Sequence, residues 1–157
     1  MAMNSISKEY LETFLSSLSV EDSHRNAKAD AYYFCADEES ANLCADLVLR
    51  GDKRATAGLK WSYDAEGESL PEVGQLSVIT NWDGVPQCIV EVTSVEVMPY
   101  NKVSADFAYE EGEGDKSLEF WRRVHWDFFS MECEEIGKEP AKDMPVILEK
   151  FKVIWKG

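Results

Sequence analysis

The sequence predicts an α+β domain in which a mixed, curved β-sheet or a β-barrel is flanked by helices. Segments rich in β-branched residues are interrupted by segments with helical spacing, and the two kinds do not alternate as regular βαβ units. The hydrophobic share of 45% and the five Trp residues are enough for a packed core. At 157 residues the chain fits a single domain, residues 1–157.

Two helices are predicted in the first third of the chain. Apolar residues recur at helical spacing from Ser7 to Leu18, and Ser5 or Ser7 can cap the first turn. The second helix, Asp37–Arg50, begins with a capping residue and an acidic first turn and stops at Gly51. We expect extended segments at 31–35, which can also be a loop, and at 54–57 and 59–63.

The middle of the chain predicts a β-hairpin. Residues 76–80 and 87–97 are rich in β-branched side chains, and Asp83-Gly84 between them is a tight-turn signal. The second strand breaks strict alternation, which indicates burial on both faces or a bulge.

Two helices and a strand are expected after this hairpin. Ser104 can cap a short helix, and Asp115 can cap a longer one that stops at Gly137. Residues 146–155 end the chain as a half-exposed strand.

The charge balance excludes several classes of function. A formal net charge of −14 repels polyanions, so a duplex DNA binder is not expected, although Lys53, Arg54 and Lys60 can form a local basic group.

No apolar run suits a membrane span or a secretory leader, so we expect a cytoplasmic protein that contacts no membrane. The four cysteines lack disulfide or zinc spacing and are expected to be reduced thiols, and no metal or organic cofactor is indicated.

Several motifs occur together in a fixed order. They are Gly51-Asp52-Lys53-Arg54-Ala55-Thr56, Leu59-x-Trp61-x-Tyr63, Leu70-Pro71-x-Val73-Gly74 and the run from Phe107 to His125 that contains Glu111-Gly112-Glu113-Gly114-Asp115. This ordered set resembles the ASCH domain family, whose fold is similar to the β-barrel of the PUA domain.

The resemblance implies an association with RNA or modified bases, and some family members are reported to be ribonucleases. A shorter group hydrolyses the amide of N4-acetylcytidine with a Lys, a Thr and a Glu, which fall on Lys53, Thr56 and Glu111. This chain differs from that group because Gly58 stands where an Arg is found there. The chain also has an N-terminal helical extension, residues 1–30, and the sequence Glu-Gly-Glu-Gly-Asp. Both features are typical of a branch of the ASCH family with longer chains.

The chemistry of amide hydrolysis suggests a role for each of the three residues. Lys53 can deprotonate the Thr56 hydroxyl, and Glu111 can pass a proton to the leaving amine. Lys53 and Thr56 converge only if the segment after Gly51 turns or bulges, because residues three apart in a strand point to opposite faces. Without a functional role, Lys53 is a cation at a helix C-terminus, Thr56 is a strand residue and Glu111 belongs to a solvated acidic loop.

Further residues are candidates for ligand contacts. His125 shares a helical face with Trp121 and can equally be a hydrogen-bonded core histidine, while aromatic side chains can stack on a base. The candidate ligand-binding residues are Gly51, Arg54, Trp61, Tyr63, Glu113, Arg122 and His125.

Three functions stay open at this level. The first is a domain that binds a nucleoside or RNA base as its ligand and hydrolyses an N-acyl group on it. The second is an RNA-binding or RNA-cleaving module, which needs Lys53, Arg54 and Lys60 in a basic stripe with Arg122 and Arg123. The third is a noncatalytic sensor of a small ligand. The sequence leaves the oligomeric state open.

Overall fold

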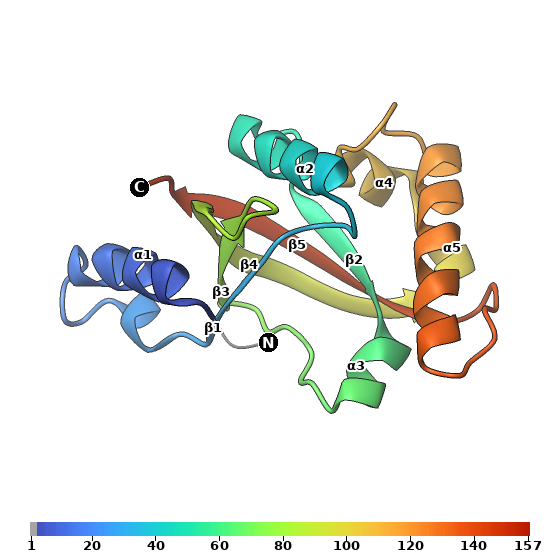
Figure 1. The fold of residues 1–157 in the computed structure, drawn as a ribbon, viewed down its shortest axis with the longest axis horizontal. Coiled ribbons are helices and arrows are strands. Elements are labelled where there is room, and N and C mark those ends of the chain that lie inside the picture. Colours follow the sequence, from blue (N-terminus) through green and yellow to red (C-terminus); the bar gives the residue numbers. More distant parts are fainter. Residues whose placement is uncertain (1–2) are drawn as a thin grey trace. The chain divides into compact units, whose positions relative to one another are not determined.

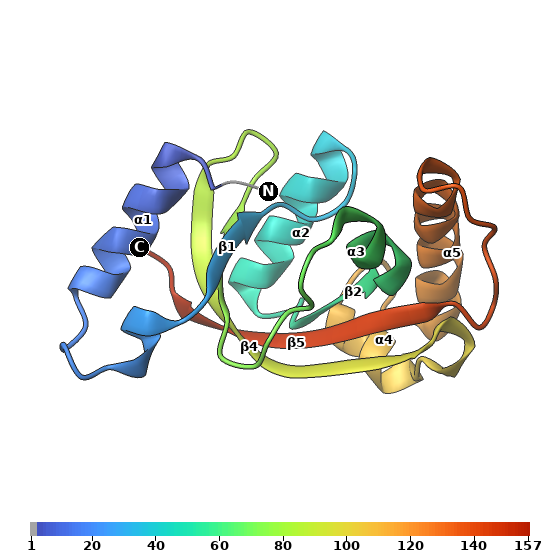
Figure 2. The same ribbon diagram turned by 90° about the horizontal axis from the view of Figure 1, so that it is seen from below.

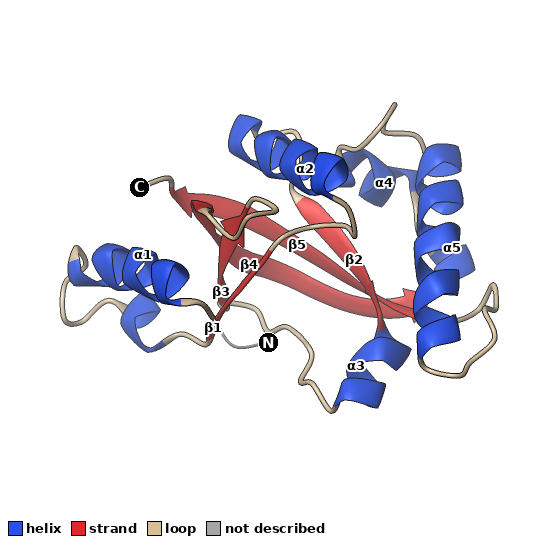
Figure 3. Cartoon of the chain, viewed as in Figure 1, coloured by secondary structure: helices blue, strands red, loops and turns tan. Residues whose placement is uncertain are grey.

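A computed structural model describes residues 3–157 of the chain as a mixed α+β fold (Figures 1 and 3). Its five-stranded sheet has the order β1-β3-β4-β5-β2. β1 runs parallel to β3, whereas the β3–β4 and β2–β5 pairs are antiparallel, so the sheet is mixed as predicted. The strands are β1 (Ala29–Tyr32), β2 (Ala55–Leu59), β3 (Leu76–Thr80), β4 (Pro86–Pro99) and β5 (Pro145–Trp155).

The sheet is open. β1 and β2 stand at the two ends of the strand order and do not pair with each other within residues 3–157, so the β-barrel alternative is not supported. No helix within that range is long and apolar enough to cross a membrane.

The described chain divides into two compact units whose segments interleave along the sequence. Unit 1 contains the described residues up to Asp52, together with Glu72–Thr93 and Phe151–Gly157. Unit 2 contains Lys53–Pro71 and Ser94–Lys150. A single domain over residues 1–157 stays a prediction.

In unit 1, helices α1 (Ser5–Ser16) and α2 (Glu38–Arg50) cover opposite faces of the β3–β4 hairpin, which Figure 2 shows from below. Val78 and Ile89 point to the side of α1, where they pack with Phe14. Ile79 and Val90, one residue further along each strand, point to the other side and pack with residues of α2. This two-sided burial explains why β4 lacks strict alternation.

The caps of the two unit 1 helices differ from the prediction in one respect. Asn4, rather than Ser5 or Ser7, caps α1, because its side chain accepts the Ser7 N–H at 2.8 Å. Asp37 caps α2 as predicted, and Gly51 ends it in the left-handed conformation. A short 3₁₀ helix, η1 (Ser23–Asn26), leads into β1, which ends at Tyr32 before most of the segment predicted at 31–35.

Unit 2 packs helices against β2 and the first part of β5. Its core joins Leu59 of β2, Val146 of β5, Phe107 of α4 and Trp121 and Phe129 of α5. The remaining elements of this unit are α3 (Lys60–Glu66), the 3₁₀ helix η2 (Tyr100–Lys102), α4 (Ala105–Glu111) and α5 (Leu118–Glu135).

Two local predictions in unit 2 are wrong. The segment 59–63 is not extended, because β2 ends at Leu59 and α3 begins at Lys60. Asp115 does not cap the long helix. Ser117 does, because its hydroxyl accepts from the Phe120 N–H, while Asp115 accepts the Ser117 N–H directly before the helix. Ser104 caps α4 as predicted.

Candidate functional site

Lys53 is placed by two backbone features on either side of it. Gly51 has φ of +81°, a conformation that costs little only for glycine, and it lets the chain leave α2 sharply. The Arg54 N–H then donates to the Glu110 carbonyl at 2.8 Å, which fixes the start of β2 to the end of α4. The chain therefore turns between the end of α2 and Lys53.

The Lys53 ammonium is buried among acceptors. Its side chain is 1% exposed, and Nζ donates to the Ala55 carbonyl at 2.9 Å, to Glu111 Oε1 at 3.1 Å and to Glu113 Oε2 at 2.9 Å. An ammonium has three N–H donors, so this geometry is that of a charged lysine whose donors all point at oxygen. Lys53 in this state is a cation and a donor rather than a base.

Glu111 is the centre of the network. It is the last residue of α4 and is almost completely buried. Oε1 accepts from Lys53, while Oε2 accepts a short hydrogen bond from the Trp121 indole and lies 3.1 Å from His125 Nε2. Burial alone would raise its pKa, but the charges of His125 and Lys53 and the hydrogen bonds from His125 and Trp121 lower the pKa of Glu111 to about 2.

His125 is held as an imidazolium. Its Nδ1 lies 2.9 Å from the Trp121 carbonyl, which only accepts, and its Nε2 faces the ionised Glu111 carboxylate. Both ring nitrogens must therefore carry a proton. Burial lowers the pKa of His125, but the charge of Glu111 and its hydrogen bond outweigh burial and raise the pKa above its usual value.

Glu113 is the least buried member of the network. Its side chain is 20% exposed, against 12% for His125, 2% for Glu111 and 1% for Lys53. The next residue, Gly114, has φ of +58°, and a Cβ there would lie 2.4 Å from the Phe120 ring. A side chain at this position would be strained and would displace the Phe120 ring, so glycine favours the close approach of the acidic loop to α5.

Thr56 is not part of these hydrogen bonds. It lies on β2, where it pairs with Glu149 of β5, and its side chain is half-buried. Among residues 3–157, the hydrogen bonds of the Lys53 network come from Ala55, Glu111, Glu113, Trp121 and His125. The structure thus brings Lys53 and Glu111 together and leaves Thr56 on the adjacent strand.

The other predicted ligand contacts lie outside this network. Trp61 and Tyr63 are on α3, where Lys138 lies over the Trp61 ring and the Tyr63 ring fills the space beside Gly58. Arg122 is exposed on α5, and its carbonyl accepts from the Tyr100 hydroxyl. Arg54 is also exposed.

Two of the lysines that the RNA-binding alternative needs in a basic stripe are engaged in ion pairs. Lys53 is buried in ion pairs, and Lys60 pairs with Asp64 at 3.0 Å on the surface of α3. Neither ammonium group is therefore placed to contact RNA phosphates in the way that this alternative requires.

Trp121 is a site residue that was not among the predicted catalytic or ligand-binding residues. Its indole bonds to Glu111, its carbonyl bonds to His125, and its ring stacks on the imidazole with centroids 4.2 Å apart. The available signal was the spacing of four residues between Trp121 and His125, which puts both on one helical face.

A cavity of about 440 Å³ lies elsewhere, in unit 1. His24 in its wall contacts the carboxylates of Glu91 and Asp22, and the hydrogen bond to Glu91 raises the pKa of the imidazole. None of the predicted site residues lines this cavity. We place the candidate site at Lys53 because its buried ionised cluster is the stronger chemical feature.

Solved structures similar to this chain carry the same fold. A crystal structure of an ASCH domain from Lactobacillus crispatus JV V101 is 53% identical, covers 99% of this chain and 98% of its own, and has a TM-score of 0.93. Protein EF3133 from Enterococcus faecalis V583, assigned to family DUF984, is 29% identical over 95% of this chain and 88% of its own, with a TM-score of 0.82. The hypothetical protein PH0355 shares only the fold, at 19% identity, 81% and 99% coverage and a TM-score of 0.52.

No curated protein matches the chain. The ASCH domain family model matches residues 30–155, which include Lys53, Glu111 and His125 and leave out α1. The chain therefore belongs to the ASCH domain family.

Proposed function

We propose that this ASCH domain binds a nucleoside, or an unpaired RNA base, at the Lys53 network and hydrolyses an N-acyl amide on the base. The observation that carries the proposal is the buried contact between Lys53 Nζ and Glu111 Oε1 at 3.1 Å. These residues are 58 positions apart in the sequence, and they match two of the three catalytic types of the amidohydrolases that the motifs resemble.

Access to Lys53 requires one of its partners to move. The Ala55 carbonyl is fixed by β2, and Glu111 is held by Trp121 and His125 as well as by Lys53. Glu113 is the least buried of these partners, at 20% exposed, so an entering acyl carbonyl displaces its carboxylate and accepts from the ammonium in its place. A buried cation in this position stabilises the negative charge that develops on the carbonyl oxygen during attack.

The same displacement supplies a base. Glu113, once released from Lys53, accepts the proton of the Thr56 hydroxyl while Thr56 Oγ attacks the acyl carbon. The amide C–N bond then breaks, Glu113 returns the proton to the departing exocyclic nitrogen, and water hydrolyses the acyl-threonine ester. Glu111 stays ionised throughout, since its pKa of about 2 leaves it no proton to donate, and its role is to hold Lys53.

A small ligand suits the charge of the chain better than a long RNA. The net charge is −14, and the two lysines of the candidate basic stripe are engaged in ion pairs. A polynucleotide gains affinity from phosphate contacts along its length, which this surface opposes.

The direct test is incubation of the purified chain with N4-acetylcytidine and other N-acylated nucleosides, with chromatographic detection of the free nucleoside. Thr56→Val keeps the shape of the side chain and removes the hydroxyl, and we expect a loss of turnover of about 10²-fold or more. Thr56→Ser, the matched control, keeps the hydroxyl and retains turnover. Glu113→Gln retains binding and loses turnover, because the amide cannot accept the proton.

Calorimetry on the same ligands separates the alternatives. Binding without turnover would refute the hydrolytic step and leave a noncatalytic ligand site. Binding of single-stranded RNA but of no nucleoside would favour the RNA-binding alternative. Absence of both binding and turnover would refute the proposal as a whole.

A further inference from the structure

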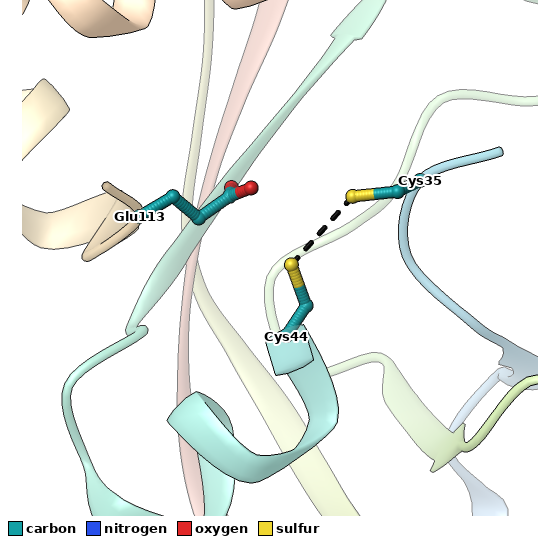
Figure 4. A group of neighbouring side chains, drawn as sticks. All are labelled: Cys35, Cys44 and Glu113. Carbon is teal, nitrogen blue, oxygen red and sulfur yellow. Dashed lines mark hydrogen bonds between the residues drawn. The ribbon is translucent and has the colours of Figure 1, made fainter. Parts of the chain in front are cut away.

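Two cysteines of unit 1 face each other, one before α2 and one within it. Cys35 lies in the segment between β1 and α2, and Cys44 lies on α2. Their sulfur atoms are 3.6 Å apart, and Figure 4 shows the two side chains pointing toward one another. A disulfide needs an S–S distance of about 2.05 Å, so the two sulfur atoms must approach by about 1.5 Å to form one.

The backbone at Cys35 supports a specific role for this residue. Its φ is +69°, in the left-handed region that residues other than glycine seldom adopt. Such positions store strain and persist only where the surroundings hold them, and they cluster at functional sites. Together with the side-chain directions in Figure 4, this places the Cys35 sulfur beside that of Cys44.

The two thiols differ in access. Cys35 is half-buried, whereas Cys44 is 2% exposed and packs in the core between α2 and the hairpin. An external oxidant therefore reaches Cys35 first, and Cys44 is positioned to attack Cys35 from inside.

The remaining cysteines are poor competitors for this chemistry. Cys88 belongs to the same core as Cys44 but is fully buried, and burial raises the pKa of its thiol to about 12. Cys133 lies in unit 2, and burial also raises the pKa of its thiol. The thiolate is the reactive form, so a raised pKa lowers the reactive fraction of both thiols at neutral pH.

We propose that Cys35 and Cys44 are a redox-active pair that a low-molecular-weight disulfide oxidises reversibly. The Cys35 thiolate attacks one sulfur of the oxidant, whose S–S bond breaks and releases one thiolate. The Cys44 thiolate then attacks the Cys35 sulfur of this mixed disulfide and expels the second thiolate. The two cysteines lose two electrons and two protons, and the oxidant becomes two thiols.

The sequence offers a clean test, because trypsin leaves both cysteines on one peptide, residues 29–50. The native chain is treated with glutathione disulfide, quenched in acid, alkylated in denaturant and digested. We expect two of the four thiols to be lost and the unalkylated peptide to be about 2 Da lighter than its reduced form. Dithiothreitol restores both thiols.

Variants distinguish the order of the two steps. Cys44→Ser should accumulate glutathione on Cys35, since no resolving thiol is present, whereas Cys35→Ser should leave Cys44 reduced. Cys88→Ala, a control in the same core, should form the disulfide as the unchanged chain does. Full alkylation of peptide 29–50, a stable mixed disulfide in the unchanged chain, or a cross-link from this peptide to Cys88 or Cys133 would overturn the proposal.

Discussion

Replacing Lys53 with methionine tests whether the buried network is a principal stabilising feature of unit 2. Lys53→Met keeps an unbranched apolar stem and removes the ammonium that Glu111 and Glu113 share. Removing one partner of a buried ion pair costs about 3–5 kcal/mol, because the other charge is left uncompensated. Glu111 keeps His125 and Trp121, and Glu113 can turn to solvent, so the expected loss is near the lower end, about 3 kcal/mol.

Lys60→Met is the matched control for this substitution. Lys60 pairs with Asp64 one helical turn away, but both side chains are well exposed, at 34% and 55%. Such a pair contributes about 0.3–0.5 kcal/mol. Replacing lysine with methionine should therefore lower the free energy of unfolding several-fold more at position 53 than at position 60.

Urea unfolding measures both losses. Tryptophan fluorescence and circular dichroism should give one transition with an unchanged slope, so that the midpoints report free energies. In the double variant Lys53→Met/Glu111→Gln, the loss should be smaller than the sum of the single losses, because the uncompensated carboxylate has been removed. If Lys53→Met falls within about 0.5 kcal/mol of Lys60→Met, the reasoning from burial is wrong.

The remaining predictions concern titration and the turn after α2. The pKa of Glu111 is about 2 in the folded protein, against the ordinary 4.5. The ionised carboxylate therefore contributes about 3 kcal/mol of stability above pH 4.5, and this contribution is lost as the pH falls toward 2. Urea titrations at graded pH should show the loss in the unchanged chain and not in Glu111→Gln. The pKa of His125 in the folded protein is raised above 6.5. Its contribution to the free energy of unfolding is therefore complete below pH 6.5 and disappears as the pH rises through the folded pKa. In His125→Gln, the free energy of unfolding should lack this dependence on pH. In Gly51→Ala the added Cβ has no atom within 4 Å, but the alanine must adopt the left-handed conformation. Thermal and urea unfolding should therefore show a loss of stability of about 1 kcal/mol. Gly51→Asn should lose less, because asparagine tolerates this conformation better.

Elements with local signals at both ends could be predicted from the sequence. Helix α2 has Asp37 before it and Gly51 after it, and the structure uses both as caps. The hairpin was predictable because β-branched residues flank a turn dipeptide, and the strands pair as expected with a register shift at Ile79 and Thr80. These features depend on residues a few positions apart.

Helix α3 shows where local reasoning fails. Alternating large side chains at 59–63 favour a strand, yet the chain turns into a helix at Lys60 with no side-chain cap. The Tyr63 ring packs 3.1 Å from the position that a Gly58 Cβ would take, so a contact with the preceding strand decides the conformation. Gly67, which ends α3 in the left-handed conformation, was the local signal for a helix end.

The site could be predicted in its residue types but not in its charge states. Family motifs pointed to Lys53 and Glu111, which the structure brings into contact, and to Thr56, which it leaves outside the network. It could not reveal that Glu113 would join them, because that contact depends on how the end of α4 meets the start of β2. A lysine beside two carboxylates is a cation, whereas the same lysine in a dry apolar cleft would be a base.

Charge balance explains why the network needs four members. With His125 protonated, Lys53, Glu111 and His125 carry one net positive charge in the interior. The Glu113 carboxylate brings the sum of the four charges to zero. Its loss leaves Lys53 still paired with Glu111, but one buried positive charge is then uncompensated, which costs stability. Glu113 is therefore part of the charge balance of the network as well as its least buried member.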